Sequence, residues 1–372
     1  MTPAAIPSAQ IKAEADRLFS YFQSAGAQPV DADILLPAET LLDLYGEDIR
    51  ARAYVTHDPV RGEMMLRPDF TLPVVLAHMQ GGADPARYCY KGEVFRKQDH
   101  LGDALRPAEY IQVGFELFDR AAPEAADAEV FALFSRALAG LPLRAVTGDI
   151  GILTAAVQGL TTTPARRGAL LRHIWRPHRF RALLDRFAGR APAPAARRAM
   201  LARLAAGDID AQIAQAGPLI GLRSADDIAA RASALLDDAN APPIPSEQAD
   251  LLMALLALKA RANCALPQLE DFARQMPTMQ GAVDRFDARL QSLAKKGVDP
   301  DTLPFEASLG RASMEYYDGF VFAFMGQDGH PPYASGGRYD ALTQVLGAGR
   351  SIPAVGGVIR PHLTAMMQGR AA

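Results

Sequence analysis

Cysteines and long apolar runs are scarce in this sequence. The 372 residues contain two cysteines, Cys89 and Cys264, whose spacing gives neither a disulfide framework nor a metal site. No signal peptide opens the chain, and no apolar run is long enough to span a bilayer. We therefore expect a cytoplasmic protein with no membrane span and no bound metal.

An excess of charge of one sign is also missing. The formal net charge is −3 and the isoelectric point is about 6.2. Such a chain has no overall positive field that attracts nucleic acid, although a basic patch can still be local. Neither G-x-G-x-x-G after a strand pattern nor G-x-x-x-x-G-K-[ST] is present, which excludes dinucleotide-binding and P-loop folds. No period of roughly 20–50 residues repeats, so a solenoid is not expected.

The chain is organised around residues 88–118, which read YCYKGEVFRKQDHLGDALRPAEYIQVGFELF. Two strand-like runs, Tyr88–Arg96 and Glu109–Phe118, flank a polar loop and predict an antiparallel hairpin with a long tip. In the second run, side chains of alternate residues point to opposite faces. The first face is apolar and is expected to pack on helices; its members are Ile111, Val113, Phe115 and Leu117.

The opposite face of the second run carries polar groups. Gln112 and Glu116 flank Gly114, which leaves room for a close approach to the backbone, and Arg96 points at the same surface. One interpretation is an internal ion pair between Glu116 and Arg96. The other is a floor for a ligand with both charges, such as a zwitterion with a polar side chain. The hairpin alone does not name that ligand.

A strand-to-helix junction precedes the hairpin. The segment Arg67-Pro68-Asp69 ends a strand pattern, and Thr71 is expected to cap the next helix, with Pro73 in its first turn. Side chains at such a junction reach into a cleft, so Asp69 and Thr71 are candidate site residues. The alternative for Asp69 is simple helix capping.

The remaining patterns predict an α+β fold. Helices are expected at 8–25, 122–139, 150–160 and after 339, and strands at 27–37, 52–57, 63–66, 143–148, 305–309 and 320–325. Residues 334–337 are expected to form a small-residue turn, and Gly356 and Gly357 allow close backbone approach. Hairpin-type connections favour a mixed, mainly antiparallel sheet with flanking helices. Residues 161–266 are predicted to be an α-helical insertion into one discontinuous domain formed by 1–160 and 267–372.

The expected insertion concentrates positive charge near His173, Trp175 and His178. Its arginines are Arg166, Arg167, Arg172, Arg176, Arg179 and Arg181. Interspersed apolar residues favour a solvated helical face, and a surface for docking a partner is the alternative.

Five motifs resemble histidyl-tRNA synthetase when they are taken in order. They are LRPDFT, GEVFR with YIQVGFE, MEYYDGFVF, SGGRYDAL and PAVGGVI. The resemblance covers roughly residues 8–120 and 300–365 and implies the fold of a class II aminoacyl-tRNA synthetase.

The resemblance also implies a histidine-binding site. Asp69 and Thr71 match the residues that hold the amino acid's α-amino group, Gln112 a contact to its backbone, and Glu116 the acceptor for its imidazole. A charged acceptor makes a stronger hydrogen bond to an imidazole N–H and rejects side chains that lack this group. The implied site is completed by Arg96, Tyr317 and Tyr339.

Several departures from the synthetase pattern concern ATP rather than histidine. His362 and Leu363 occupy the positions at which the family has a glutamate–arginine pair. Gln98 replaces an acidic residue of the family, and Ala312, which follows Arg311, replaces an arginine. Nine residues follow Leu363 in this sequence, so we expect the synthetase's anticodon-binding domain to be missing. Cations stabilise the charge that develops on a reacting phosphate, so their loss implies lost adenylation.

This combination resembles the family of regulatory subunits of ATP phosphoribosyltransferase, which are paralogues of histidyl-tRNA synthetase. The resemblance implies a non-catalytic partner with no catalytic residues and no cofactor. It implies a homodimer within a hetero-oligomer that contains the short-form catalytic subunit, histidine as effector, and no tRNA binding. The alternatives are a truncated histidine-activating enzyme and a pure scaffold with a vestigial pocket.

Overall fold

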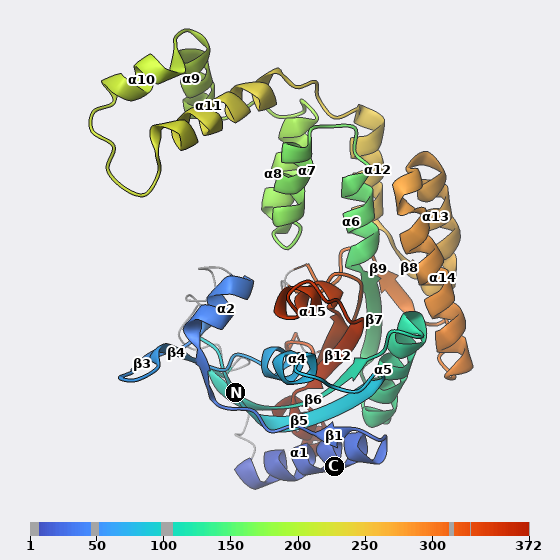
Figure 1. The fold of residues 1–372 in the computed structure, drawn as a ribbon. Coiled ribbons are helices and arrows are strands. Elements are labelled where there is room, and N and C mark those ends of the chain that lie inside the picture. The colour runs from blue at the N-terminus through green and yellow to red at the C-terminus, as the bar shows by residue number, and fades with distance from the viewer. Residues whose placement is uncertain (1–6, 46–51, 98–106, 312–315, 328, 372) are drawn as a thin grey trace.

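The computed structural model describes residues 7–45, 52–97, 107–311, 316–327 and 329–371. Within these residues a nine-stranded sheet has the order β1-β5-β6-β12-β11-β10-β7-β9-β8 (Figure 1). Only β1–β5 and β7–β9 pair in parallel, so the expected mixed, mainly antiparallel sheet is confirmed. In that order, the strand bounds are Gln28–Pro29, Ala86–Phe95, Glu109–Phe118, Ala354–Ile359, Ala334–Arg338, Phe320–Met325, Arg144–Asp149, Pro304–Glu306 and Lys259–Arg261.

The expected hairpin is the centre of this sheet. Strands β5 and β6 pair antiparallel along their whole length, from Ala86 opposite Phe118 to Phe95 opposite Glu109. The apolar face of β6 packs on helices α1 (Ser8–Ser24) and α5 (Pro123–Ala137), as predicted. The ring of Phe22 on α1 lies 5.6 Å from that of Phe115 and 5.3 Å from that of Phe134. The polar face of β6 therefore points to the other side, toward α4 (Thr71–Met79) and α15 (Asp340–Leu346) (Figure 1).

A second, three-stranded sheet has the order β2-β4-β3. It contains β2 (Leu35–Pro37), β3 (Val55–Asp58) and β4 (Gly62–Leu66), and α2 (Ala38–Tyr45) packs against it. The expected hairpin across residues 52–66 is confirmed. The single strand expected at 27–37 is wrong, because β1 and β2 belong to different sheets and the polar segment around Asp31 and Asp33 separates them.

The small-residue turn expected at 334–337 is also wrong, because these residues lie in strand β11 between β10 and β12. A Cβ at Gly336 would lie 2.3 Å from the carbonyl oxygen of Gly356, and one at Gly337 would lie 2.6 Å from that of Phe320. The small residues here serve close contact between neighbouring strands rather than a change of chain direction. Strand β9 is likewise shorter than the run expected at 305–309, since turns begin at Ala307.

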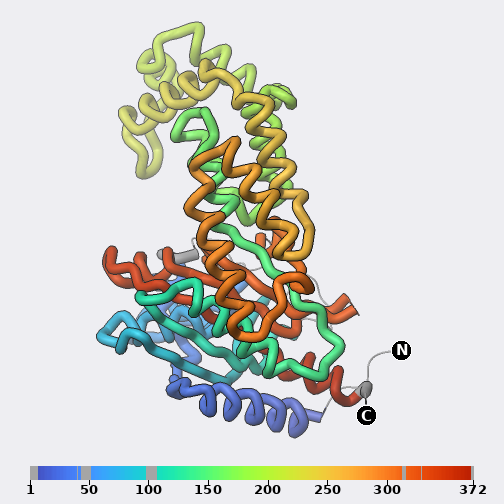
Figure 2. Tube along the Cα trace, turned by 90° about the vertical axis from the view of Figure 1, so that its right-hand side faces the viewer, coloured from blue at the N-terminus to red at the C-terminus, as the bar shows by residue number. Residues whose placement is uncertain are grey.

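Between β7 and β9 the chain is mostly helical, and it forms β8 on the way. The helices are α6 (Ile150–Gln158), α7 (Pro164–Arg172), α8 (Pro177–Phe187), α9 (Ala195–Ala205), α10 (Ile209–Gln215), α11 (Ala225–Asn240), α12 (Ser246–Ala257), α13 (Ala262–Gln275), the short 3₁₀ helix η1 (Pro277–Met279) and α14 (Gln280–Lys295). Helices α9, α10 and α11 stand away from the sheet in both views (Figures 1 and 2). Of their side chains only Ala232 is buried.

The division of the chain at 161–266 stays a prediction. Helices α7–α12 fall inside that range, while β8, also inside it, pairs with β9 and extends the main sheet. Arg166 is a structural residue rather than part of a solvated face. Its Nε donates to Asp238 Oδ1 at 2.7 Å and its Nη1 to the carbonyl oxygen of Pro242 at 2.8 Å, which ties α7 to the end of α11. Among the described residues, no helix is both long and apolar enough to cross a membrane.

Candidate functional site

The candidate site lies on the polar face of β5, β6 and β12. Strand pairing sets Tyr90 opposite Gly114 and Glu116 opposite Gly356. Residues that oppose each other in antiparallel strands point to the same side of a sheet. Helix α4 and the chain just before α15 cover this side, so side chains from distant segments meet over β6 (Figure 1).

Glu116 is the centre of this group. Its side chain is buried, and three hydroxyl groups donate to its carboxylate. Tyr90 donates to Oε1 at 2.9 Å, Thr71 to Oε1 at 3.1 Å and Tyr339 to Oε2 at 2.7 Å. Burial raises the pKa of Glu116 to about 7, the three hydroxyl groups oppose this rise, and the nearby Asp69 carboxylate adds to it.

Two glycines make room for this carboxylate and its partner. A Cβ at Gly356 would lie 1.5 Å from Glu116 Oε2, and a Cβ at Gly114 would overlap the Tyr90 ring at 2.2 Å. The close approach expected at Gly114 and Gly356 therefore exists, and the approaching groups are the protein's own Tyr90 and Glu116. Tyr90 was not recognised from the sequence. The feature that could have revealed Tyr90 is its position opposite Gly114 in the predicted hairpin.

An ion pair between Glu116 and Arg96 is not formed. Among the described residues, no cationic side chain lies within 4.0 Å of Glu116, and Arg96 Nε donates to the carbonyl oxygen of Pro68 at 2.8 Å. The ion-pair interpretation of the hairpin is therefore wrong. Arg96 nonetheless lies on the expected face, since its backbone pairs with Ala108 and continues the register of β5.

The junction residues behave differently from capping groups. Helix α4 begins at Thr71, but its N-cap position is Phe70, and the Thr71 hydroxyl is directed at Glu116. The expected capping role of Thr71 is therefore wrong. Asp69 is buried beside this group, and its Oδ1 accepts from the backbone N–H of Leu72 at 3.5 Å, a long contact that gives weak capping at most.

The tyrosines of the EYYDG motif complete the group. Tyr317 is buried, and its ring lies 4.7 Å from that of Tyr316. Tyr316 in turn lies 6.0 Å from Tyr339, and its hydroxyl is 3.4 Å from Thr71 Oγ1. The structure thus brings Asp69, Thr71, Glu116, Tyr317 and Tyr339 together as the resemblance implies. Gln112 lies on the same face four residues before Glu116 on β6, and Arg96 lies on this face just beyond the end of β5.

An ionised carboxylate offers about four acceptor positions, two on each oxygen. Among the described residues, two donors contact Oε1 of Glu116 and one, Tyr339, contacts Oε2. By this count Oε2 has the capacity to accept one more N–H donor. The arrangement suits recognition of a small group that carries an N–H.

Comparison with known proteins decides the family. A family model described as histidyl-tRNA synthetase matches residues 6–240 and 222–362. An ATP phosphoribosyltransferase regulatory subunit from Agrobacterium fabrum is 33% identical over 92% of this chain and 93% of its own length. One from Mesorhizobium japonicum is 33% identical over 94% and 95%. The chain belongs to the family of ATP phosphoribosyltransferase regulatory subunits.

Solved structures support the fold of this family. A Bacillus halodurans protein, titled as an ATP phosphoribosyltransferase regulatory subunit/histidyl-tRNA synthetase, aligns with a TM-score of 0.69 at 21% identity, over 98% of this chain and 80% of that chain. Histidyl-tRNA synthetase from Nostoc sp. aligns with a TM-score of 0.64 at 15% identity, over 100% of this chain and 76% of that chain. The class II synthetase-like α+β fold predicted from the sequence is confirmed.

Leu363 and Arg311 lie at or beside positions where this chain departs from the synthetase motifs. Leu363 is buried in α16 (Pro361–Ala371), where an arginine stands in the synthetase motif. Arg311 does not replace the arginine lost at Ala312. Its Nε donates to the carbonyl oxygen of Ile174 at 2.7 Å and its guanidinium lies 4.8 Å from the Phe180 ring, so it faces α8. Gln98 and Ala312 lie outside the described residues.

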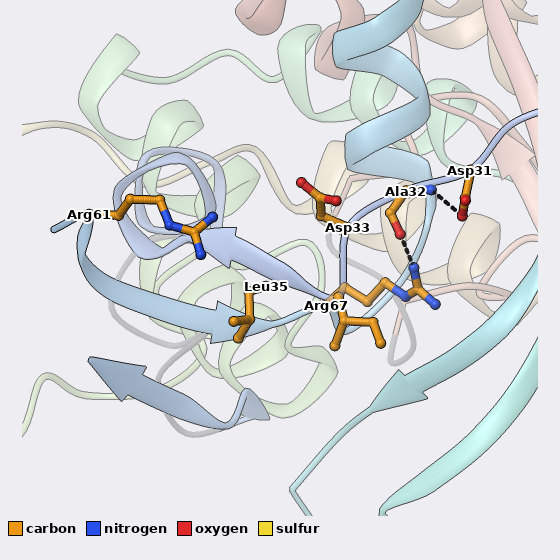
Figure 3. A pocket seen from close by; sticks show the side chains of 7 residues that line it. Asp31, Ala32, Asp33, Leu35, Arg61 and Arg67 are labelled. Atoms are coloured by element: carbon orange, nitrogen blue, oxygen red, sulfur yellow. Dashed lines mark hydrogen bonds between the residues drawn. The ribbon is translucent and has the colours of Figure 1, made fainter. Parts of the chain in front are cut away.

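Outside the Glu116 group, the described residues form a hollow and no metal-binding cluster. Among the described residues, no cluster of histidine, cysteine, aspartate and glutamate side chains fits a metal ion. A hollow of about 570 Å³ borders the small sheet and is lined by Asp31, Ala32, Asp33, Ile34, Leu35, Arg61 and Arg67 (Figure 3). Arg67 is a structural residue there, since its Nη1 donates to the carbonyl oxygen of Ala32 and its Nε to that of Glu93 at 2.8 Å. The hollow is separate from the Glu116 group.

Proposed function

We propose that this chain is the non-catalytic regulatory subunit of ATP phosphoribosyltransferase and that it activates the short-form catalytic subunit. In this proposal the complex catalyses the first step of histidine biosynthesis, and histidine inhibits it by binding to this chain. The names of the curated relatives support the regulatory role. The observation that supports the histidine-binding part is the buried carboxylate of Glu116, whose Oε2 accepts from one described donor, Tyr339.

The physical case for histidine rests on the imidazole N–H. A buried carboxylate that accepts from an N–H forms a charge-assisted hydrogen bond, which is stronger than one between neutral groups. An amino acid without that N–H would leave the acceptor unpaired, which costs affinity. The residues assigned to histidine binding are Asp69, Thr71, Arg96, Gln112, Glu116, Tyr317 and Tyr339, which share one face of the sheet.

The physical case against catalysis rests on charge. Transfer of an adenylyl group needs cations at the α-phosphate. Leu363 offers an apolar side chain where the synthetase motif has an arginine, and Arg311 is held by α8. A truncated histidine-activating enzyme is the alternative. It requires histidine-dependent exchange of pyrophosphate into ATP by the purified chain, and the proposal expects none.

Inhibition by histidine follows from linkage. A ligand shifts an equilibrium only by its difference in affinity for the two states. Histidine must therefore bind more tightly to the less active state of the complex. We place the chain as a homodimer within a hetero-oligomer that does not bind tRNA.

The deciding experiment is co-purification with a short-form transferase. We expect the transferase alone to be nearly inactive, the mixture to be active, and histidine to inhibit the mixture. Full turnover by the transferase alone would contradict the activating role. Activation that histidine does not affect would leave the chain as a scaffold with a vestigial pocket.

A Glu116→Gln variant tests the pocket itself. Losing the charged acceptor should weaken histidine binding by about 1–3 kcal/mol, the range for a hydrogen bond to a charged group. Titration calorimetry measures the affinity, and the histidine concentration for half-inhibition of the complex gives a second measure. If neither changes while the wild-type chain responds to histidine, the pocket lies elsewhere.

A further inference from the structure

The polar face of the sheet ends in a group of cationic and polar side chains beyond Glu116. Strand β12 pairs with β6 so that Ile359 lies opposite Val113, which places Arg360 beside Gln112. The hairpin register places Arg96 on this face beyond Tyr110. We call Arg96, Tyr110, Gln112, Arg360 and His362 the cationic end of the face.

Among the described residues, the hydrogen-bond partners of Arg360 are neutral groups. Its Nη1 donates to the carbonyl oxygen of Pro332 at 2.5 Å, and both terminal nitrogens lie 3.5 Å from Ser335 Oγ. The Tyr110 hydroxyl is a further hydrogen-bond partner. Over the described ranges of the chain, no carboxylate lies within ion-pair distance of this guanidinium. Burial lowers the pKa of Arg360, and the nearby positive charge of Arg96 lowers it further.

The neighbours of Arg360 also have unused hydrogen-bonding capacity. The His362 ring lies 5.3 Å from that of Tyr110, and neither of its ring nitrogens has a partner among the described residues. Burial, Arg360 and His330 lower the pKa of His362 to about 4, so the ring is neutral and can accept or donate. Gln112 is fully buried, and within the same part of the chain its Oε1 has no partner.

A partly buried guanidinium without a counter-charge is costly, because the cation has lost water and gained no ion pair. Burial raises the pKa of Tyr110, but Arg96 and Arg360 outweigh this and leave it lowered, as expected beside concentrated positive charge. An incoming anion would remove this cost and form charge-assisted hydrogen bonds with the arginine fork.

We propose that the cationic end binds an oxyanion, with Arg360 as its main contact and Gln112 and His362 as supporting groups. The two sources of that chemistry are the carboxylate of an amino acid and a phosphate group. Four residues of β6, about 13 Å of strand, separate Gln112 from Glu116. Tyr317 interacts electrostatically with both Glu116 and Arg360, so the two groups border one region in which a small zwitterion could contact both. The carboxylate arm rests on the proposed histidine-binding function, and the phosphate arm does not.

The experiment compares Arg360→Gln with the wild-type chain by titration calorimetry. The probes are histidine, histamine, which keeps the imidazole and amine but lacks the carboxylate, and inorganic pyrophosphate. A carboxylate site predicts that histidine binding weakens by roughly 10- to 100-fold while histamine binding is unchanged. A phosphate site predicts the same loss for pyrophosphate and none for histidine.

Arg350→Gln is the matched control. The Arg350 guanidinium also donates to backbone carbonyl oxygens, those of Gly347 and Met79, but it lies away from the cationic end. Arg360→Lys keeps the charge and should restore part of the binding. A His362→Glu chain supplies an internal carboxylate beside Arg360; it should fold at least as stably as wild type and lose binding of either anion.

The inference is overturned if Arg360→Gln and His362→Glu fold and neither changes the affinity for histidine or pyrophosphate, or if the wild-type chain binds neither anion. The proposed function fails separately. Pyrophosphate binding that depends on Arg360, with no histidine response in the transferase complex, keeps the anion site and removes the histidine effector. Histidine inhibition that Arg360→Gln leaves unchanged, together with pyrophosphate binding that does not depend on Arg360, keeps the histidine effector and removes the anion site.

Discussion

Glu116 is surrounded by hydroxyl groups instead of cations, and these neighbours set its affinity for a proton. Three hydroxyl donors stabilise the ionised carboxylate, but burial and the Asp69 carboxylate outweigh them. Its folded pKa of about 7 lies above the ordinary value of 4.5. Between these values the folded state binds more protons than the unfolded state, so stability falls as pH rises through this window.

This fall in stability with rising pH gives a prediction for Glu116→Gln. From about pH 5 to pH 8 the wild-type chain should lose up to about 3 kcal/mol relative to the variant, since the neutral amide has no proton to release. Urea unfolding at several pH values measures the difference. A wild-type curve that runs parallel to that of the variant would show that Glu116 titrates normally.

Single residues also show how far the sequence could predict the site. Alternation along one strand was enough to place Gln112 and Glu116 on one face, because this property is local. Tyr90 and Arg360 were missed because each owes its role to the strand beside it. The register that sets Tyr90 against Gly114, and Arg360 beside Gln112, is a long-range property of the fold.

At the scale of elements, glycines on β11 and β12 adapt the sheet to its buried charge. Gly356 lies opposite Glu116, and Oε2 occupies the space that a side chain would need. Glycine is a turn signal when only the sequence is available, which is why residues 334–337 were predicted to turn. The space that Gly336 and Gly337 leave is visible only when β10, β11 and β12 are paired.

Gly356→Ala should therefore disturb the Glu116 group. The added Cβ must displace a carboxylate that three hydroxyl groups hold, so we expect destabilisation of about 1–3 kcal/mol and a weaker histidine response. Gly369→Ala is the control, because a Cβ there meets nothing within 4 Å on helix α16 and should be neutral or stabilising. Equal effects of the two substitutions on urea unfolding would contradict the tight fit at Gly356.

At the scale of the whole molecule, the helices between α6 and α12 contact the synthetase-like sheet at few points. Arg311 is one such point, since it comes from the segment before the EYYDG tyrosines and binds the turn between α7 and α8. Burial lowers the pKa of Arg311 to about 10. Arg311 thus ties the segment that precedes the EYYDG tyrosines to the expected insertion.

Arg311→Met tests this connection. The variant keeps apolar contact with Phe180 but loses the hydrogen bond to the carbonyl oxygen of Ile174, so the turn at 173–176 should open more often. Hydrogen exchange of the backbone amides in 173–180 should become faster, by about 5-fold for a loss of roughly 1 kcal/mol. Arg172→Met, at an exposed position on α7, is the control and should leave these amides unchanged. Unchanged exchange in Arg311→Met would mean that α7 and α8 hold the turn by themselves and that Arg311 does not stabilise it.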